Sequence, residues 1–289
     1  MAAEVERLSA AYRGPDRARA ARTPAAVAAY LAYRAPATFA AAAAVCRQVR
    51  AQRPEWAPRS LLDVGAGPGA ATWAALAAWP SLEVVTLVEA EPAMAAAGRA
   101  LLPDARWVEA DVADARGPAD LVLCSYVLGE LADPTGAAMH LWEQAADTVA
   151  FVEPGTPDGY RRVLAARAAV LECGGHTVAP CPHDRPCPLA AGDWCHFAVR
   201  LPRSRLHRQA KGAELGWEDE SFSYAVLSRV PVTPAAARII RRPKPRSGYV
   251  ELLTSDADGE IRERRVPKSA GAAYKHARKA TWGDALDVS

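Results

Sequence analysis

The sequence predicts an α/β fold in which helices cover both faces of a doubly wound, mostly parallel sheet. Apolar runs of strand length alternate with helix-forming stretches between residues 59 and 172. Strands that alternate with helices form right-handed crossover units, and such units build a parallel sheet. A turn with three glycines follows the first of these strands, where open α/β sheets bind nucleotides and nucleoside-like cofactors. We therefore expect a cofactor crevice at the carboxyl ends of the strands.

Length, composition and charge limit the class of protein. The chain has 289 residues, 51% of them hydrophobic, which suits a main domain with a smaller appendage. Its formal net charge is +2, so a nucleic-acid partner would have to meet a local basic patch. The start, Met1 to Arg13, has the pattern of neither a signal peptide nor a transit peptide, and no apolar run could span a bilayer. We expect a soluble protein of the bacterial cytoplasm with no membrane contact.

The N-terminal region, residues 1–58, is expected to be helical. Thr23 and Pro24 form a helix start, because threonine caps a helix and proline suits its first turn. A second helix should cover Pro36–Arg50, and the prolines that follow should end it.

The core, residues 59–172, carries the alternating pattern. Its strands are expected at Ser60–Val64, Leu82–Val88, Arg106–Glu109, Ala119–Ser125 and Thr148–Glu153. Its helices are expected at Ala70–Ala78, Glu91–Leu102, Gly136–Ala146 and 155–172. Each helix can carry the chain back over the sheet, so the consecutive strands should run parallel.

Three further regions follow the core. Residues 173–215 are rich in Pro, Gly, Cys, His and Arg, and we expect an irregular, basic insertion there. Residues 216–235 hold the strand Phe222–Arg229, which should return to the main sheet. Residues 236–289 should form a basic C-terminal unit with a hairpin and a helix, at Tyr249–Thr254, Glu260–Val266 and Tyr274–Ala280.

The glycine turn favours one class of cofactor. Its spacing is G-x-G-x-G, at Gly65, Gly67 and Gly69, and it lacks the final gap of the dinucleotide fingerprint. Glycines allow positive φ angles and leave no Cβ in the way of a ligand. The helix that follows offers no Lys or Arg to a phosphate. The turn therefore favours S-adenosylmethionine over NAD or FAD.

Polar side chains at the strand ends complete the candidate cofactor site. Asp63 precedes the turn, and Glu89 ends the second strand, where a carboxylate suits the two hydroxyls of a ribose. Asp111 follows the third strand and could accept a hydrogen bond from an exocyclic amine such as that of adenine. Ser125 ends the fourth strand and belongs to the same candidate set. The alternative is that these groups only solvate the strand ends.

No catalytic residue is predicted. The stretch Cys124–Glu130 after the fourth strand lacks the Asn/Asp-Pro-Pro-Tyr/Phe motif of exocyclic-amine methylation. Cys124 lacks the Pro-Cys context of a pyrimidine methyltransferase, and a cysteine in a buried strand is commonly a small hydrophobe. Glu130 could be a general base, but an acid at a helix start is commonplace.

Three cysteines in a proline-rich stretch indicate a metal or iron–sulfur site. Cys181, Cys187 and Cys195 follow a C-x5-C-x7-C pattern. Structural zinc sites usually show paired C-x2-4-C knuckles, whereas wide spacings suit a cluster wrapped by a loop. Unliganded thiols are the alternative. The fourth ligand stays open, and proximity in sequence suggests Cys173, His176, His183 or His196.

The glycine turn and the cysteine segment together resemble the small-ribosomal-subunit methyltransferase-like proteins of bacteria and mitochondria. The likeness covers nearly the whole chain, and its cysteine segment is much more specific than its glycine turn. The segments that carry it are Leu62–Gly69, Val152–Thr156, Ala179–Pro188, Asp193–Phe197 and Ala277–Asp284.

The resemblance implies a Rossmann-like class I methyltransferase fold that binds S-adenosyl-L-methionine and carries a 4Fe-4S cluster, with zinc as the alternative. It also implies binding to small-subunit rRNA in the pre-30S particle during ribosome assembly, and it indicates no obligate protein partner. Cys181, Cys187 and Cys195 take the places of three cluster ligands. The family's fourth cysteine belongs near the hairpin before the terminal helix, where this chain reads Leu252–Gly259 without a cysteine.

Three functions remain open at this point. The chain could methylate rRNA, bind rRNA as a non-catalytic assembly factor with the cofactor as a structural ligand, or methylate a small molecule. Three basic stretches are candidate phosphate contacts, since such contacts give affinity without reading sequence. They are Arg200–Lys211, Arg238–Arg246 and Lys275–Lys279.

Overall fold

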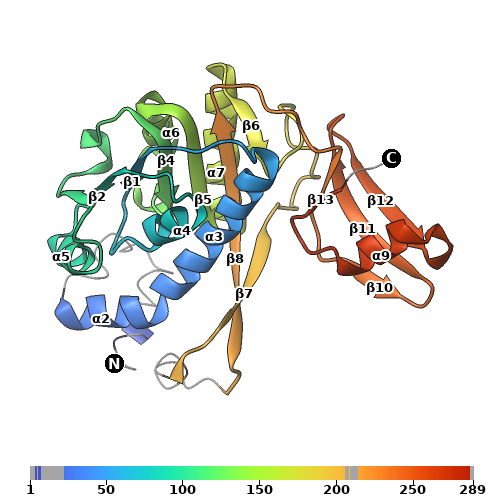
Figure 1. Ribbon diagram of the computed structural model, residues 1–289, viewed down its shortest axis with the longest axis horizontal. Coiled ribbons are helices and arrows are strands. Elements are labelled where there is room, and N and C mark those ends of the chain that lie inside the picture. Colours follow the sequence, from blue (N-terminus) through green and yellow to red (C-terminus); the bar gives the residue numbers. More distant parts are fainter. Residues whose placement is uncertain (1–3, 5, 8–22, 206–207, 209–213, 287–289) are drawn as a thin grey trace.

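The computed structural model describes residues 4, 6–7, 23–205, 208 and 214–286, and it contains a main α/β unit and a smaller C-terminal β unit (Figure 1). The main sheet has the strand order β3-β2-β1-β4-β5-β8-β6, with β7 paired to β8. The first five strands are mutually parallel, and β8 runs antiparallel to its neighbours. These strands are β1 (Ser60–Val64), β2 (Val84–Val88), β3 (Arg106–Val108), β4 (Ala119–Ser125), β5 (Ala145–Pro154), β6 (His176–Ala179), β7 (Phe197–Pro202) and β8 (Trp217–Ser228).

The strand order reverses between β1 and β4. Open α/β sheets bind ligands beyond the carboxyl ends of the strands at such a reversal. Leu61 pairs with Leu121 and Val64 with Cys124, so β1 and β4 end side by side. The glycine turn after β1 therefore begins where a ligand is expected.

Helices cover both faces of the main sheet. Along β1, Leu61 packs in one core cluster with α3 and α4, whereas Leu62 packs in the other with α6 and α7. Successive strand residues point to opposite faces, which explains why neighbours enter different cores. The helices are α2 (Pro24–Tyr33), α3 (Ala35–Gln52), α4 (Ala70–Ala78), α5 (Pro92–Leu101), α6 (Pro134–Gln144) and α7 (Pro157–Glu172).

Helix starts follow the local sequence signals. The Thr23 side chain accepts a 3.1 Å hydrogen bond from the Ala26 N–H, and proline occupies the first turn of α2. Thr156 caps α7 in the same way, through the Gly159 N–H. Such caps satisfy backbone donors that have no partner within the helix.

The predicted α/β fold is confirmed, and several elements match residue for residue. β1, α4 and β4 have the bounds expected from the sequence, and the other core elements are displaced by a few residues at their ends. The part of region 1–58 before Thr23 lies largely outside the described residues.

The expectation of an irregular stretch after residue 172 is wrong in two places. β6 belongs to the main sheet, where Thr177 pairs with Leu227 and Ala179 with Val226 of β8. β7 is the second place: Phe197–Pro202 pair with the acidic first half of β8, which begins at Trp217 rather than at the predicted Phe222. Arg200 faces Asp219 in this register and donates a 2.8 Å hydrogen bond from Nε to Oδ1. Cross-strand ion pairs thus stabilise a hairpin that the sequence pattern predicts as a loop.

The C-terminal unit is a five-stranded sheet with a helix packed on it (Figure 1). Its core consists of Ile239, Val250, Leu252 and Ala277. The predicted hairpin is β11 and β12, and the predicted helix is α9. The elements are β9 (Ala237–Ile239), β10 (Lys244–Arg246), β11 (Tyr249–Asp256), β12 (Ile261–Pro267), α9 (Ala272–Lys279) and β13 (Ala285–Leu286). None of the helices that the described residues form has the length and apolar character of a membrane span.

Candidate functional site

The glycine turn after β1 requires glycine for two reasons. Gly65, Gly67 and Gly69 have φ angles of 67°, 55° and 90°, which L side chains rarely adopt. A Cβ on Gly65 would lie 2.3 Å from Val127 Cγ2, inside contact distance. A Cβ on Gly67 would lie 3.6 Å from the Tyr30 hydroxyl, so α2 covers the turn closely.

Asp63 is buried directly below this turn. Its Oδ2 accepts a 2.6 Å hydrogen bond from the Thr72 hydroxyl on α4, which ties β1 to the helix that follows. Its Oδ1 has no hydrogen-bond partner among the described residues. Burial raises the pKa of Asp63 to about 6. A buried carboxylate oxygen without a partner is a candidate acceptor for a ligand.

Glu89 connects the end of β2 to the turn. Its Oε2 accepts a 2.7 Å hydrogen bond from the Gly67 N–H, and its Oε1 accepts a 2.8 Å bond from the Glu91 N–H. Burial raises the pKa of this carboxyl group. Each carboxylate oxygen can accept further hydrogen bonds, so ribose hydroxyls could still bind here.

Ser125 ends β4, and Asp111 follows β3. The two residues differ in exposure. The Ser125 hydroxyl is buried and has no partner among the described residues. Asp111 is exposed, and its Oδ1 accepts a 3.1 Å hydrogen bond from the Val112 N–H at the start of a short 3-10 helix. The four polar groups expected around a cofactor thus lie along one edge of the sheet, with Asp111 outermost.

A polar network beside this crevice has no signal in the sequence. Tyr126, directly after β4, has a φ angle of 64° although it is not glycine. Its hydroxyl donates a 2.8 Å hydrogen bond to Glu220 Oε1 on β8. Arg34, from the N-terminal helices, binds both Glu220 oxygens at 2.8 and 3.0 Å and lies 4.5 Å from the centre of the Tyr126 ring.

The candidate nucleophile, Cys124, is shielded from solvent. Cys124 is fully buried in β4, and burial raises its pKa well above the ordinary value. A thiol that stays protonated does not attack a base. The interpretation of Cys124 as a small hydrophobic residue fits this environment.

The three cysteines of the predicted metal site line a single cavity. Cys181, Cys187 and Cys195 share this cavity with Ser255 and with apolar side chains. The Tyr160 hydroxyl donates a 3.1 Å hydrogen bond to Cys187 Sγ. Burial raises the pKa of Cys181 and, more strongly, that of Cys195. Metal binding would have to displace these thiol protons.

Two buried arginines hold the cysteine loop. Arg167 of α7 donates 2.6 and 3.1 Å hydrogen bonds to the carbonyls of His183 and Arg185. Arg238 of β9 donates a 2.9 Å bond to the Pro180 carbonyl and is 2% exposed. Both positive charges oppose the effect of burial on the pKa of Cys181. Arg238 therefore supports the loop and is not accessible to a phosphate, contrary to the expectation from its basic stretch.

The proposed fourth ligands do not line the cavity. Cys173 is exposed at the C-terminal end of α7. His176 pairs with Asp184, and His196 stacks on Trp194 with ring centres 5.5 Å apart. His183 lies behind the cavity wall, with its Nε2 3.3 Å from Ser255 Oγ.

The donor set suits a soft metal centre, but the described residues hold no preassembled ion site. No three His, Cys, Asp or Glu side chains among them are placed to hold one metal ion. A multi-iron cluster spreads its ligands over a larger body than a single ion does, and thiolates are its usual ligands. The cavity offers three thiols, the ligand type of such a cluster, and iron–sulfur and zinc occupancy are both predictions.

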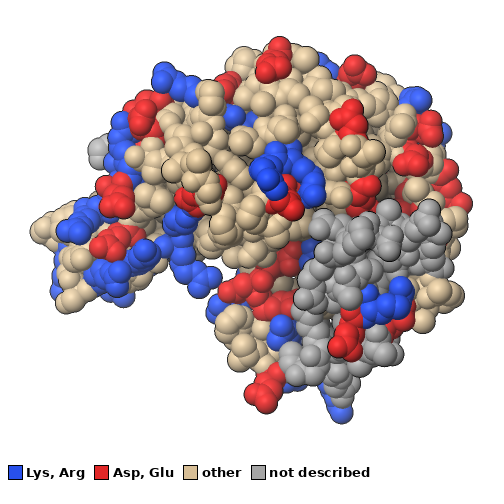
Figure 2. All heavy atoms as spheres, turned by 180° about the vertical axis from the view of Figure 1, so that it is seen from behind, with Lys and Arg blue, Asp and Glu red and all other residues tan. Residues whose placement is uncertain are grey.

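The basic stretches differ in how many free cations they offer. On β7 and the loop before β10, arginines pair with acidic side chains, as in Arg200–Asp219 and Arg241–Asp193. On α9, Lys275, Arg278 and Lys279 are exposed and form no ion pair with any described residue. Figure 2 shows Lys and Arg side chains gathered on the projecting C-terminal unit, with acidic side chains between them. Residues 206–207 and 209–211 of the first basic stretch lie outside the described residues.

Comparison with known proteins places this architecture in a family. A family described as mitochondrial small ribosomal subunit Rsm22 matches residues 24–287. The chain belongs to the Rsm22 family. This match confirms the resemblance to small-subunit methyltransferase-like proteins.

Relatives of this Rsm22-family chain are longer than it is. The human mitochondrial ribosome assembly protein METTL17 is 28% identical over 287 residues, which cover 90% of this chain and 62% of that protein. The mitochondrial Rsm22-cox11 tandem protein 2 of Schizosaccharomyces pombe is 26% identical over 78% of this chain and 38% of its own length. The chain therefore spans less than two thirds of either relative.

Solved structures that match this chain distantly include methyltransferases. Among solved structures, the plantazolicin methyltransferase BpumL in complex with SAH has a TM-score of 0.45 and 11% identity. The alignment covers 79% of this chain and 96% of that one.

The prediction of a bacterial cytoplasmic protein is wrong, because the matching family and both relatives are described as mitochondrial. That prediction depended on the composition of the first residues. The family match instead covers residues 24–287.

Proposed function

We propose that this Rsm22-family chain binds S-adenosyl-L-methionine and small-subunit rRNA, and acts as an assembly factor of the small ribosomal subunit. We further propose that its cysteine cavity carries a 4Fe-4S cluster. One observation carries the proposal: a single family match, residues 24–287, spans the cofactor crevice, the cysteine cavity and the basic C-terminal unit. The relative METTL17 is named a ribosome assembly protein.

The crevice supports cofactor binding through its unsatisfied groups. Asp63 Oδ1 and Ser125 Oγ are buried without partners among the described residues, at the ends of adjacent strands. Buried polar atoms without partners cost free energy, and a ligand that pairs with them recovers it. The open backbone of the glycine turn leaves room for such a ligand beside Glu89.

The side chains around Tyr126, where a methyl acceptor would bind, favour cofactor binding without methyl transfer. Tyr126 occupies the place where exocyclic-amine methyltransferases hold their motif, and its hydroxyl is engaged by Glu220. Both Glu220 oxygens are in turn engaged by Arg34. The Arg34 guanidinium pairs with the Glu220 carboxylate and makes it a poorer proton acceptor for a substrate. We therefore rank the non-catalytic assembly factor first.

Methyl transfer to rRNA is the second candidate, and one observation favours it. Tyr126 holds a left-handed backbone conformation, which is costly for a bulky residue and is concentrated at functional sites. A substrate base that displaced the Arg34–Glu220 pair would meet this tyrosine.

A transfer assay separates the two candidates. The full chain is incubated with radiolabelled S-adenosylmethionine and small-subunit precursor particles, and cofactor binding is measured in parallel by calorimetry. Cofactor binding without label in rRNA is the expected result. Label in rRNA would establish the second candidate, and absence of cofactor binding would contradict the cofactor proposal.

The RNA proposal is tested by charge reversal on the C-terminal unit. Replacing Lys275, Arg278 and Lys279 by Glu should weaken RNA binding and lower the salt dependence of log Kd by about 0.7 per lost contact with single-stranded RNA. The matched control reverses three exposed arginines of the α/β unit, at Arg99, Arg106 and Arg116. Equal losses in both variants would show that net charge, not this surface, drives binding. No RNA affinity in the parent chain would favour a small-molecule methyltransferase.

A further inference from the structure

We propose that Ser255 supplies the fourth side-chain ligand of the cluster that Cys181, Cys187 and Cys195 hold. This inference rests on the proposed cluster and assigns its fourth ligand. The cavity that the three thiols line is closed from the C-terminal unit by Ser255, Ile240 and Ile261. Of these three residues, only Ser255 offers a side chain that can bind a metal.

The backbone of Ser255 is fixed on both sides. In β11, Ser255 pairs with Arg238 of β9 and with Ile261 of β12. The residue is 5% exposed, so its hydroxyl faces the interior. A ligand on a doubly paired strand holds its position better than a ligand on a loop.

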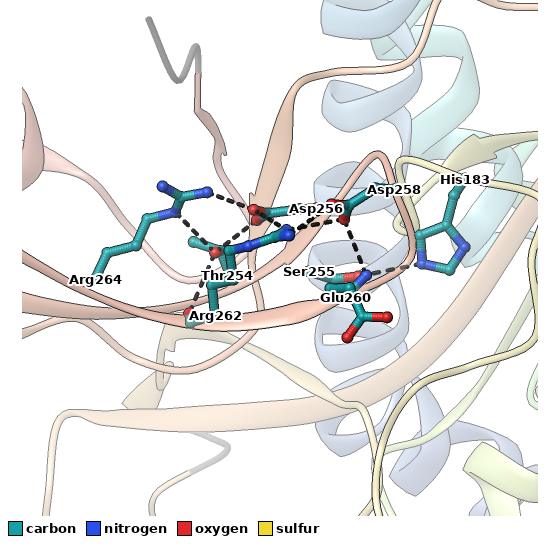
Figure 3. Close-up of polar contacts among 8 residues, drawn as sticks. All are labelled: His183, Thr254, Ser255, Asp256, Asp258, Glu260, Arg262 and Arg264. Atoms are coloured by element: carbon teal, nitrogen blue, oxygen red, sulfur yellow. Dashed lines mark hydrogen bonds and ion pairs between the residues drawn. The ribbon is translucent and has the colours of Figure 1, made fainter.

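Strand alternation separates Ser255 from the charged network beside it. Thr254 and Asp256 point to the opposite face of β11, as successive strand residues do. Asp256 Oδ2 accepts a 2.7 Å hydrogen bond from Arg262 and also binds Arg264 (Figure 3). These arginines neutralise and occupy the carboxylate. Asp256 is therefore not the fourth ligand, although its network anchors the strand that carries Ser255.

His183 positions the hydroxyl without entering the cavity. Its Nε2 lies 3.3 Å from Ser255 Oγ, and Figure 3 shows the ring directed at the serine. Arg167 fixes the His183 backbone through a 2.6 Å hydrogen bond to its carbonyl. The serine oxygen has two lone pairs, so it can bind a metal while it keeps this contact.

An oxygen at the fourth corner changes how firmly the cluster holds its fourth iron. Thiolates are the preferred ligands of iron in such clusters, and a serine oxygen is a harder ligand. The iron at the serine corner should therefore leave first when the cluster is oxidised. On oxidation by ferricyanide, ferricyanide gains one electron, the cluster loses it, and one ferrous ion departs to leave a three-iron centre.

The test changes only the proposed ligand. Full-length chains are reconstituted without air with ferrous iron and sulfide, and iron and sulfide are counted per chain. Ferricyanide is then added, and the three-iron centre is followed by electron paramagnetic resonance. Ser255→Cys should lose its fourth iron about tenfold more slowly than the parent chain, a change typical of altered metal shells. Ser255→Ala should lose it faster than the parent.

Two controls keep the outcomes separate. Ser247→Cys adds an exposed thiol to the same unit and should behave as the parent chain. Cys181→Ser should fail to retain the cluster. If the parent and Cys181→Ser bind equally little iron, the proposed cluster site is wrong, and the Ser255 assignment falls with it. If the parent holds iron, Cys181→Ser does not, and both Ser255 variants decay at the parent rate, only the Ser255 assignment is overturned.

Discussion

Arg34 donates two hydrogen bonds, of 2.8 and 3.0 Å, to the carboxylate of Glu220, 186 residues away in the sequence. Arg34 links α2 to α3, and Glu220 lies on the long strand β8. The two side chains are 21% and 15% exposed, so the pair is largely shielded from water. It closes the N-terminal helices over the end of β4, where Tyr126 contacts both side chains.

Breaking this pair should destabilise the fold. Arg34→Ala leaves the Glu220 charge largely buried without its partner, and we expect a loss of about 3 kcal/mol in the free energy of unfolding, measured by urea titration. Arg161→Ala, which breaks an exposed ion pair with Asp158, is the control and should cost less than about 1 kcal/mol. Equal losses in the two variants would contradict the structural role of Arg34.

Alanine should be less well tolerated at the crowded Gly69 of the cofactor turn than at a glycine with open space around it. Gly69 and Gly248 both have a φ angle of 90°, but only Gly69 is crowded, because a Cβ added there would lie 2.6 Å from Leu102 Cδ1. Gly248→Ala should cost about 1–2 kcal/mol from backbone strain. Gly69→Ala should cost about 1–3 kcal/mol more, because the added methyl group overpacks the core. Urea unfolding of both variants measures the difference, and identical costs would refute the crowding.

Glu153 should make stability depend on pH. Burial raises its pKa from 4.5 to about 7, and its side chain is 1% exposed. The folded chain therefore binds this proton more tightly than the unfolded chain. The resulting stabilisation is complete below pH 4.5 and is lost as pH rises through 7.

Glu153→Gln removes that dependence. Between the two ends of this pH range, the unfolding free energy of the parent should fall by about 3 kcal/mol relative to the Gln variant. Chemical denaturation at several pH values measures the difference, with the exposed Glu55→Gln as control. A constant difference between parent and Glu153→Gln across the range would exclude a buried, shifted carboxyl group.

Glu89 should contribute to cofactor affinity through its charge. Glu89→Gln keeps the shape of the side chain but replaces one carboxylate acceptor by a donor, and a hydrogen bond to a charged group is worth about 1.5–3 kcal/mol. We expect at least about a tenfold rise in the Kd for S-adenosylmethionine by calorimetry. Glu109→Gln, at an exposed position after β3, is the control. An unchanged Kd in Glu89→Gln would remove Glu89 from the cofactor site.

Local sequence patterns were sufficient for the core elements and for the outline of the sites. The apolar runs of β1 and β4 and the helix α4 could be delimited because burial and helix propensity act over a few residues. The glycine spacing indicated the crevice, since positive φ angles require glycine locally. β7 was missed because it lies in the stretch predicted as an irregular insertion. The first half of β8 was missed because that half is acidic, and β7 and this half pair with each other.

The sequence by itself determined the doubly wound fold, the glycine turn after Asp63 and the three spaced cysteines of one family. Only the tertiary structure decided which distant residues complete each site. It set Arg34 and Glu220 beside Tyr126, buried Arg238 against the cysteine loop, and brought Ser255 to the cavity of Cys181. These contacts depend on the register and packing of strands far apart in the chain, so no local pattern of residue types encodes them.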